Sequence, residues 1–180
     1  MRSQRVARTL VVPVAAVLIA GATGIAALGA ADRSQTLVYA VYNGQDTASQ
    51  VFKTMKSGQS TTGERIESYA VVSKDLKGKV QIRDQRTRDS GVGAILGGVI
   101  GLVGGPVGVA AGAAAGGAMG YLTGEAVGIP RDKVESMKQS LTPDSSALVV
   151  VLDDRWVQDV QRDLNQAHAR AVIANQIAGN

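Results

Sequence analysis

Residues 90–124 read SGVGAILGGVIGLVGGPVGVAAGAAAGGAMGYLTG and set the architecture that the flanking segments must accommodate. The stretch has no charged residue, and it holds 13 of the 22 glycines of the chain. Residues four apart share one face of a helix, so glycines at that spacing let two helices approach at backbone contact distance. The glycines with this spacing are Gly93, Gly97, Gly101 and Gly105 in one run, and Gly104, Gly108, Gly112, Gly116, Gly120 and Gly124 in a second.

The length of this stretch predicts a break in its middle. One continuous helix would measure about 50 Å, whereas the hydrocarbon core of a bilayer is about 30 Å thick. Gly104, Gly105 and Pro106 form the natural break, because paired glycines relax the backbone and proline cannot donate into a continuing helix. We therefore expect a glycine-zipper helical hairpin over residues 91–124, transmembrane or membrane-inserted, with limbs at about residues 91–103 and 107–123.

Residues 1–31 predict a second membrane segment. Arg2, Arg5 and Arg8 precede an uncharged run of 23 residues at positions 9–31, which is long enough to span a bilayer. A cleavable secretory signal has the same pattern, but its apolar region is usually only about 7–15 residues long, which favours an uncleaved anchor. Because basic residues hold the start of such a segment inside, we expect an integral protein of the cell membrane with an extracytoplasmic soluble domain.

The flanking segments predict one α+β domain that the hairpin splits. Residues 32–90 contain, in order, a strand at 37–42, an amphipathic helix around 48–55, and strands at 66–73 and 80–82. Residues 125–180 contain, in order, a helix from Pro130, a strand at 147–152, a helix capped by Asp153 and Asp154, and a strand near 171–177. Neither half has enough apolar residues to be stable alone. We therefore expect the halves to join as a split ferredoxin-like sandwich.

These segments carry a family resemblance. The run at residues 69–120, which begins YAVVSKDLKGK and continues through the glycines, and the run LTPDSSALVVVL at residues 141–152 resemble the bacterial family catalogued as domain of unknown function 1269. The resemblance extends over about residues 38–175, and the apolar run at 9–31 lies outside it. It implies a membrane-associated protein of unassigned activity and transfers no catalytic residue.

Composition excludes several kinds of site. The chain has no cysteine, which removes disulfides, thiolate metal sites and thiol nucleophiles. Three of its four net positive charges lie in the first eight residues, and it has one Trp and one Phe, so neither the electrostatic footprint nor the stacking platform of a nucleic-acid-binding protein is present. His168 is the only histidine and has no second soft ligand beside it. We expect no catalytic residue, no cofactor and no metal.

Two further patterns involve paired glycines and clustered basic residues. Gly58 and Gly63 have the spacing of a phosphate-binding loop, but Glu64 and Arg65 stand where lysine and serine or threonine are required, and the segment follows a predicted helix instead of a strand. We therefore expect no phosphate-binding loop here. Basic residues flank the predicted hairpin and are candidates for contacts with lipid headgroups, although a solvated face with interspersed acids explains them equally well. These candidates are Lys79, Arg83, Arg86, Arg88 and Arg131.

The sequence therefore predicts a non-enzymatic integral membrane protein. Its hairpin is expected to drive self-association to a homo-oligomer, with the α+β domain displayed at the membrane surface as an envelope or stress-related scaffold. Two alternatives stay open: a small oligomeric pore, and a membrane-tethered regulatory domain that binds a small ligand. Neither the ligand nor the oligomer size can be predicted from the residues.

Overall fold

The computed structural model describes residues 34–88, 90–116 and 128–177, without the side chains of Gln59, Ser90 and residues 106–116. The strands in these ranges are β1 (Gln35–Asn43), β2 (Ser68–Lys74), β3 (Val80–Arg86), β4 (Ser145–Asp153) and β5 (Ala171–Ile177). The α-helices are α1 (Thr47–Thr54), α2 (Ser90–Gly116), α3 (Arg131–Ser140) and α4 (Val157–Gln166). Shorter helical turns lie at Met55–Gln59, Gly63–Arg65 and Asp154–Trp156. The prediction of an α+β fold is confirmed.

The described strands form one antiparallel sheet in the order β3-β2-β4-β1-β5. β1, from the first half of the chain, pairs with β4 and β5 from the second half, with Val38 opposite Val150 and Leu37 opposite Asn175. The two halves are therefore interleaved, and neither could keep this sheet without the other. β3 extends the sheet beyond β2 and forms one of its edges.

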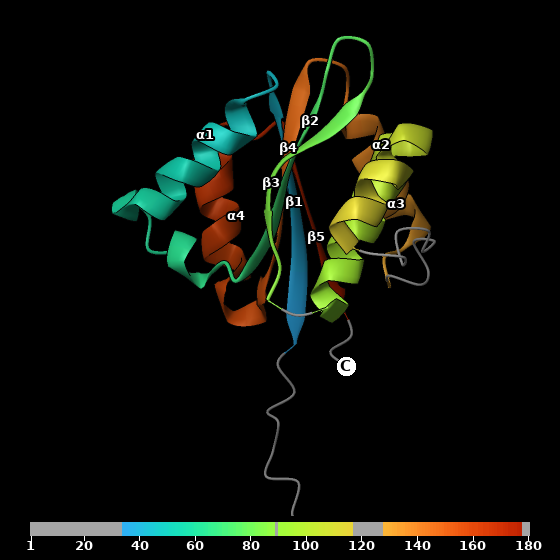
Figure 1. The fold of residues 1–180 in the computed structure, drawn as a ribbon. Coiled ribbons are helices and arrows are strands. Elements are labelled where there is room, and N and C mark those ends of the chain that lie inside the picture. The colour runs from blue at the N-terminus through green and yellow to red at the C-terminus, as the bar shows by residue number, and fades with distance from the viewer. Residues whose placement is uncertain (1–33, 89, 117–127, 178–180) are drawn as a thin grey trace, which may run out of the picture. The chain divides into compact units, whose positions relative to one another are not determined.

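Helices α1 and α4 cover one face of the sheet, on the left in Figure 1. Alternate residues of β1 and β4 point to this face, among them Val38, Ala40 and Leu148. Phe52 from α1 and Leu164 from α4 pack against them and are almost fully buried. The helical stripes predicted from residue spacing therefore form this layer of the core.

Helices α2 and α3 cover the opposite face, on the right in Figure 1. The apolar residues of α2 recur at helical spacing and pack against the residues of β1 and β4 that point to this side. The buried apolar residues of α2 are Val92, Leu96, Val99, Ile100 and Val103. Burying each such side chain contributes roughly 1.5–3 kcal/mol. This finding corrects the prediction for residues 91–103: the segment is a core helix of the α+β unit, and its apolar stripe faces the sheet.

The predicted break within the glycine stretch is confirmed. Gly105 has φ 63° and ψ −151°, a conformation that interrupts α2 and that only glycine adopts without strain. At Gly104 a Cβ atom would lie 3.3 Å from the side chain of Val80, so the missing side chain allows α2 to approach β3 closely. Glycine at this position therefore serves a helix-on-sheet contact.

The zipper prediction differs from the structure over the first run of glycines. Gly93, Gly97 and Gly101 are buried within the single chain, so this stripe is not exposed for a second helix in this arrangement. Gly120 and Gly124 lie outside the described residues, as do residues 1–31. No helix in the described ranges is both long enough and apolar enough to cross a bilayer.

Candidate functional site

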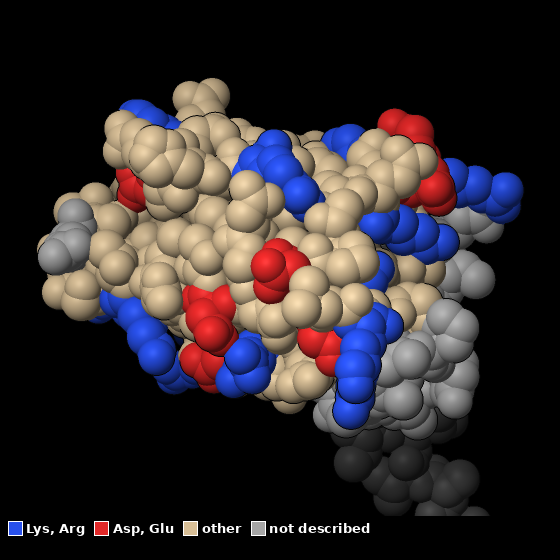
Figure 2. Space-filling model, turned by 90° about the horizontal axis from the view of Figure 1, so that it is seen from above, with Lys and Arg blue, Asp and Glu red and all other residues tan. Residues whose placement is uncertain are grey.

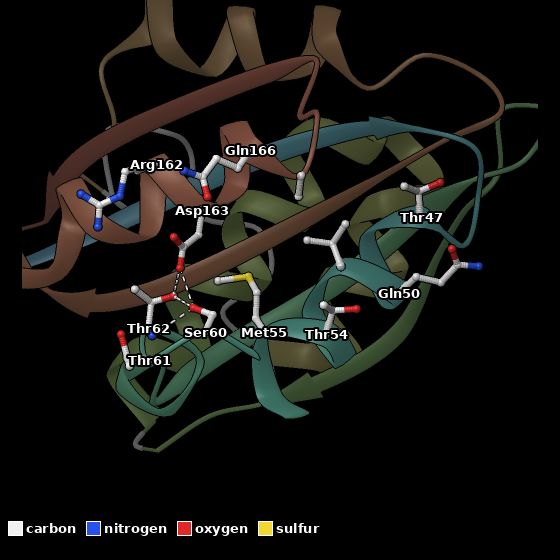
Figure 3. Close-up of a pocket in the computed structure, with 12 residues that line it drawn as sticks. Thr47, Gln50, Thr54, Met55, Ser60, Thr61, Thr62, Arg162, Asp163 and Gln166 are labelled. Carbon is white, nitrogen blue, oxygen red and sulfur yellow. Dashed lines mark hydrogen bonds between the residues drawn. The ribbon is translucent and has the colours of Figure 1, made fainter. Parts of the chain in front are cut away.

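An open cleft lies between α1 and α4, on the outer side of the helical layer that they form (Figure 3). Its volume is about 610 Å³, within the range of roughly 300–1,000 Å³ that is usual for small-molecule sites. Thr47, Gln50 and Thr54 of α1 line one side, and Asp163 and Gln166 of α4 line the other.

The amphipathic pattern of each helix explains why polar groups reach the cleft. In α1, Ala48 and Phe52 are spaced by four and buried toward the sheet, which leaves the hydroxyl and amide side chains on the other faces. In α4, Val160 and Leu164 have the same spacing and the same role. Val51 and Met55 supply the apolar part of the lining.

A hydrogen-bonded cluster closes one end of the cleft. Ser60 and Thr62 both donate to Oδ2 of Asp163, at 2.5 Å and 2.6 Å, and their own hydroxyl oxygens lie 2.5 Å apart. The Thr62 backbone N–H also donates to the Ser60 hydroxyl at 3.1 Å. These bonds join the loop after α1 to α4, about 100 residues further along the chain, and fix three polar groups at the cleft wall (Figure 3).

Gly58 and Gly63 determine the backbone conformation of this loop. Gly58 has φ 84° and reverses the chain at the end of the helical turn that follows α1. A Cβ atom at Gly63 would lie 2.1 Å from the carbonyl oxygen of Met55, so a larger residue cannot occupy this position without moving the backbone. The backbone of this loop therefore requires glycine at both positions.

The cleft has the chemistry of a binding site. The charged residues that line the cleft are Asp163 and Arg162, and Arg162 pairs with Asp159 at 2.5 Å. The remaining polar groups are hydroxyls and amides, which donate and accept hydrogen bonds without titrating near neutral pH. Within the described ranges, no group of three or more His, Cys, Asp or Glu side chains could hold a metal ion.

The candidate lipid-binding residues are spread over the structure. Lys79 precedes β3 at the upper end of the sheet in Figure 1, whereas Arg88 lies beyond the other end of β3 and pairs with Glu67. Arg83 pairs with Asp46 at 2.6 Å, and Arg131 begins α3, which contacts β5 at the opposite sheet edge. Figure 2, seen from above, shows basic and acidic side chains interspersed on the upper end. The structure therefore does not bring these five residues together as one patch.

The residues at the start of α4 have separate roles. The Asp153 carboxylate accepts a hydrogen bond from the Arg155 backbone N–H, which confirms its predicted capping role. Asp154 differs from the prediction, because its side chain accepts from Thr36 and Gln176 and joins the strand ends instead. His168 is exposed with φ 61° and follows the end of α4 as a turn residue.

Sequence reasoning did not find the cleft. Ser60 and Thr62 belong to a run of hydroxyl residues between Gly58 and Gly63, and this run was the available signal for a polar loop. Nothing near Asp163 in the sequence indicates its partners, because they reach it only through tertiary packing.

The fold and the cleft define a small α+β protein with helices on both faces of its sheet and an open polar site on one of them. Residues 91–179 match the family described as protein of unknown function (DUF1269), which confirms the resemblance. The match takes in α4 and its side of the cleft, whereas α1 lies before it. No curated protein and no solved structure matches the chain.

Proposed function

We propose that the chain is a non-enzymatic, membrane-tethered binding protein whose α1–α4 cleft holds a small polar ligand. The observation that carries this proposal is the preformed cleft itself, in which Ser60, Thr62 and Asp163 are already locked by hydrogen bonds. A site that is organised before binding loses little conformational entropy when the ligand arrives. Gln50 and Gln166, both exposed, supply further donors and acceptors.

The same hydrogen bonds argue against nucleophilic catalysis. A serine nucleophile needs an adjacent base, and here Ser60 shares its carboxylate partner with Thr62. Asp163 accepts both protons at one oxygen and orients no imidazole among the described residues. The arrangement supports a binding role for the cleft.

The tether in this proposal is the apolar run at residues 9–31. Its 23 uncharged residues are long enough to span a bilayer, and Arg2, Arg5 and Arg8 favour a cytoplasmic start. The chain would then sit in the bacterial inner membrane with the α+β unit on the extracytoplasmic side. The interleaved order β5-β1-β4-β2 supports a ferredoxin-like core for that unit, to which β3 and the α2–α3 layer are added.

Self-association is a second proposal, and it rests on the later glycines. Gly108, Gly112, Gly116, Gly120 and Gly124 keep the four-residue spacing beyond the break at Gly105. This spacing supports close packing against a second copy of the chain. The scaffold role predicted from the sequence would depend on self-association through these glycines.

A thermal-shift experiment on the full chain in detergent tests the ligand proposal. The probes are D-glucose, glycerol, L-glutamine and succinate, which cover polyols, an amino acid and a dicarboxylate. We expect at least one probe to raise the melting temperature, because a ligand that binds only the native state stabilises it. Thr54→Trp fills the cleft and should abolish the shift in melting temperature. Lys53 is exposed and lies outside the cleft, so Lys53→Trp is the control and should retain the shift. No shift with any probe, or a shift that survives Thr54→Trp, would contradict the proposal.

A further inference from the structure

One end of the sheet gathers the start of β1 and the turn that precedes α4. We call it the lower sheet end; it holds Gln35, Asp153 and Ile177 and lies at the bottom of Figure 1. The backbone N–H of Asp154 donates to the carbonyl of Ser34 at 3.1 Å, and Thr36 donates to the Asp154 carboxylate. The chain therefore enters the domain beside the Asp154–Trp156 turn, and hydrogen bonds hold it there.

The same end carries an aromatic and basic surface. Trp156 is partly exposed, and the guanidinium of Arg65 stacks over its ring with the central carbon 4.6 Å from the ring centroid. The side chains of Arg88 and Arg155 are 62% and 66% exposed and pair with Glu67 and Asp153. Tryptophan favours the membrane–water interface, and guanidinium groups bind phosphate with matched geometry.

The length of the connecting chain limits how far this end can lie from a tether. Only residues 32–34 stand between the apolar run, which ends at Ala31, and Gln35. Four peptide steps span at most about 14 Å at roughly 3.5 Å each. The opposite end of the sheet, with the β2–β3 turn around Leu76, lies about 30 Å from the lower sheet end, because β1 has nine residues at about 3.4 Å each.

We infer that the lower sheet end is the surface that this domain lays against lipid headgroups, with Trp156 and Arg65 at the bilayer interface. This inference rests on the proposed tether and adds the orientation of the domain. Arg88 and Arg155 already have acidic partners, so the surface carries mixed charge and docking does not require anionic lipid. Leu76, 76% exposed beside Lys77, is another candidate for membrane contact, but it belongs to the β2–β3 turn at the opposite end of the sheet.

Quenching of tryptophan fluorescence tests this orientation, because Trp156 is the only tryptophan of the chain. The full chain is reconstituted into phosphatidylcholine vesicles with or without bromine on the upper part of the acyl chains, and flotation confirms that it is bound. We expect Trp156 to be quenched by the brominated vesicles. The control is Trp156→Phe combined with Leu76→Trp, which moves the fluorophore to the far end and should reduce the quenching at least threefold.

The possible outcomes distinguish failure of the proposed orientation from failure of the proposed tether. If the wild-type chain floats with vesicles and Trp156 is not quenched, the orientation is wrong while the tether stands. Equal or stronger quenching of the Leu76→Trp control also overturns the orientation, since the far end would then reach the bilayer. Failure to float overturns the tether, and the orientation with it. The wild-type measurement needs no substitution, so it is decisive even if the control variant folds poorly.

Discussion

Tyr39 and Tyr42 are both buried in β1 but point to opposite faces of the sheet, and they differ in hydrogen bonding. The Tyr39 hydroxyl donates to the carbonyl of Met137 at 3.3 Å, on the side of α2 and α3. The Tyr42 hydroxyl lies in the other cluster and has no hydrogen-bond partner among the described residues. One strand therefore carries a satisfied and an unsatisfied buried hydroxyl.

This difference predicts opposite effects of removing the two hydroxyls. Tyr42→Phe removes a buried unpaired group and should leave the free energy of unfolding unchanged or raise it by up to about 1 kcal/mol. Tyr39→Phe removes one hydrogen bond to the Met137 carbonyl, which still accepts from the Ser140 hydroxyl and the Leu141 backbone N–H, and should lower the free energy of unfolding by about 0.5–1.5 kcal/mol. Urea unfolding followed by circular dichroism measures both. A larger loss from Tyr42→Phe than from Tyr39→Phe would contradict the assignment.

The same residues predict a loss of stability in alkaline solution. Burial raises the pKa of both Tyr39 and Tyr42 well above the ordinary value of about 10. Above pH 10 the unfolded chain releases protons that the native chain keeps, so the free energy of unfolding falls as pH rises, by up to about 1.4 kcal/mol per pH unit for each residue. Below pH 10 this contribution is fully present. The double variant Tyr39→Phe/Tyr42→Phe should show a flatter pH profile between 9.5 and 11.5, and an unchanged slope would argue against this origin.

The cluster at the cleft predicts that Asp163 stabilises the fold. Asp163→Ala removes two hydrogen bonds to a carboxylate and leaves the nearly buried Thr62 hydroxyl without its acceptor. A hydrogen bond to a charged group contributes about 1.5–3 kcal/mol, so a loss of roughly that size is expected in urea unfolding. Asp159→Ala is the matched control, since Asp159 lies one turn earlier on α4 and forms an exposed ion pair with Arg162, so its removal should cost less. Equal effects of the two variants would exclude the proposed role of the cluster.

The second proposal, self-association, depends on the later glycines. Gly112→Leu and Gly116→Leu should weaken assembly, because leucine pushes a facing helix away even though it makes the segment more apolar. Ala113→Leu places a leucine about 100° around the helix from Gly112 and should leave assembly intact. Crosslinking in detergent and in bilayers measures the oligomers. The same oligomers in the glycine variants and the control would rule out a zipper.

Residue patterns predicted most of the elements, because each one carries its own periodic signal. The strands around Val38, Val72 and Val149 and the helices around Phe52 and Val160 lie where the pattern places them. The pairing of two half-domains in one sheet also follows from the small number of apolar residues in each half. These features depend on local sequence and on simple counts.

The place of α2 was not predicted, although a signal for it exists. The runs around Tyr39 and Val149 are continuously apolar, which is typical of strands that are buried on both faces. The amphipathic stripes of α1 and α4 cover only one face, so a further helical layer was required. The apolar and glycine-rich composition of residues 91–103 matches a membrane limb equally well, and composition alone cannot distinguish the two environments.

α2 packs on the sheet of the α+β unit, and the close approach of Gly104 to Val80 allows this packing to be tested by crosslinking. A Cβ atom at Gly104 would lie 3.3 Å from Cβ of Val80, close to the spacing of about 3.5–4.5 Å that a disulfide spans. The chain has no cysteine of its own, so Val80→Cys/Gly104→Cys introduces a single pair.

The measurement is oxidation of this variant in intact cells that express the full chain, followed by mass spectrometry of the linked peptides. Gln81→Cys/Gly104→Cys is the control, because Gln81 is exposed and successive strand residues point to opposite faces. We predict that the Val80→Cys pair forms a disulfide nearly completely while the Gln81→Cys pair does so at least tenfold less. Equal, low crosslinking of the two pairs would show that residues 91–104 lie away from the sheet, as a limb inserted in the bilayer would.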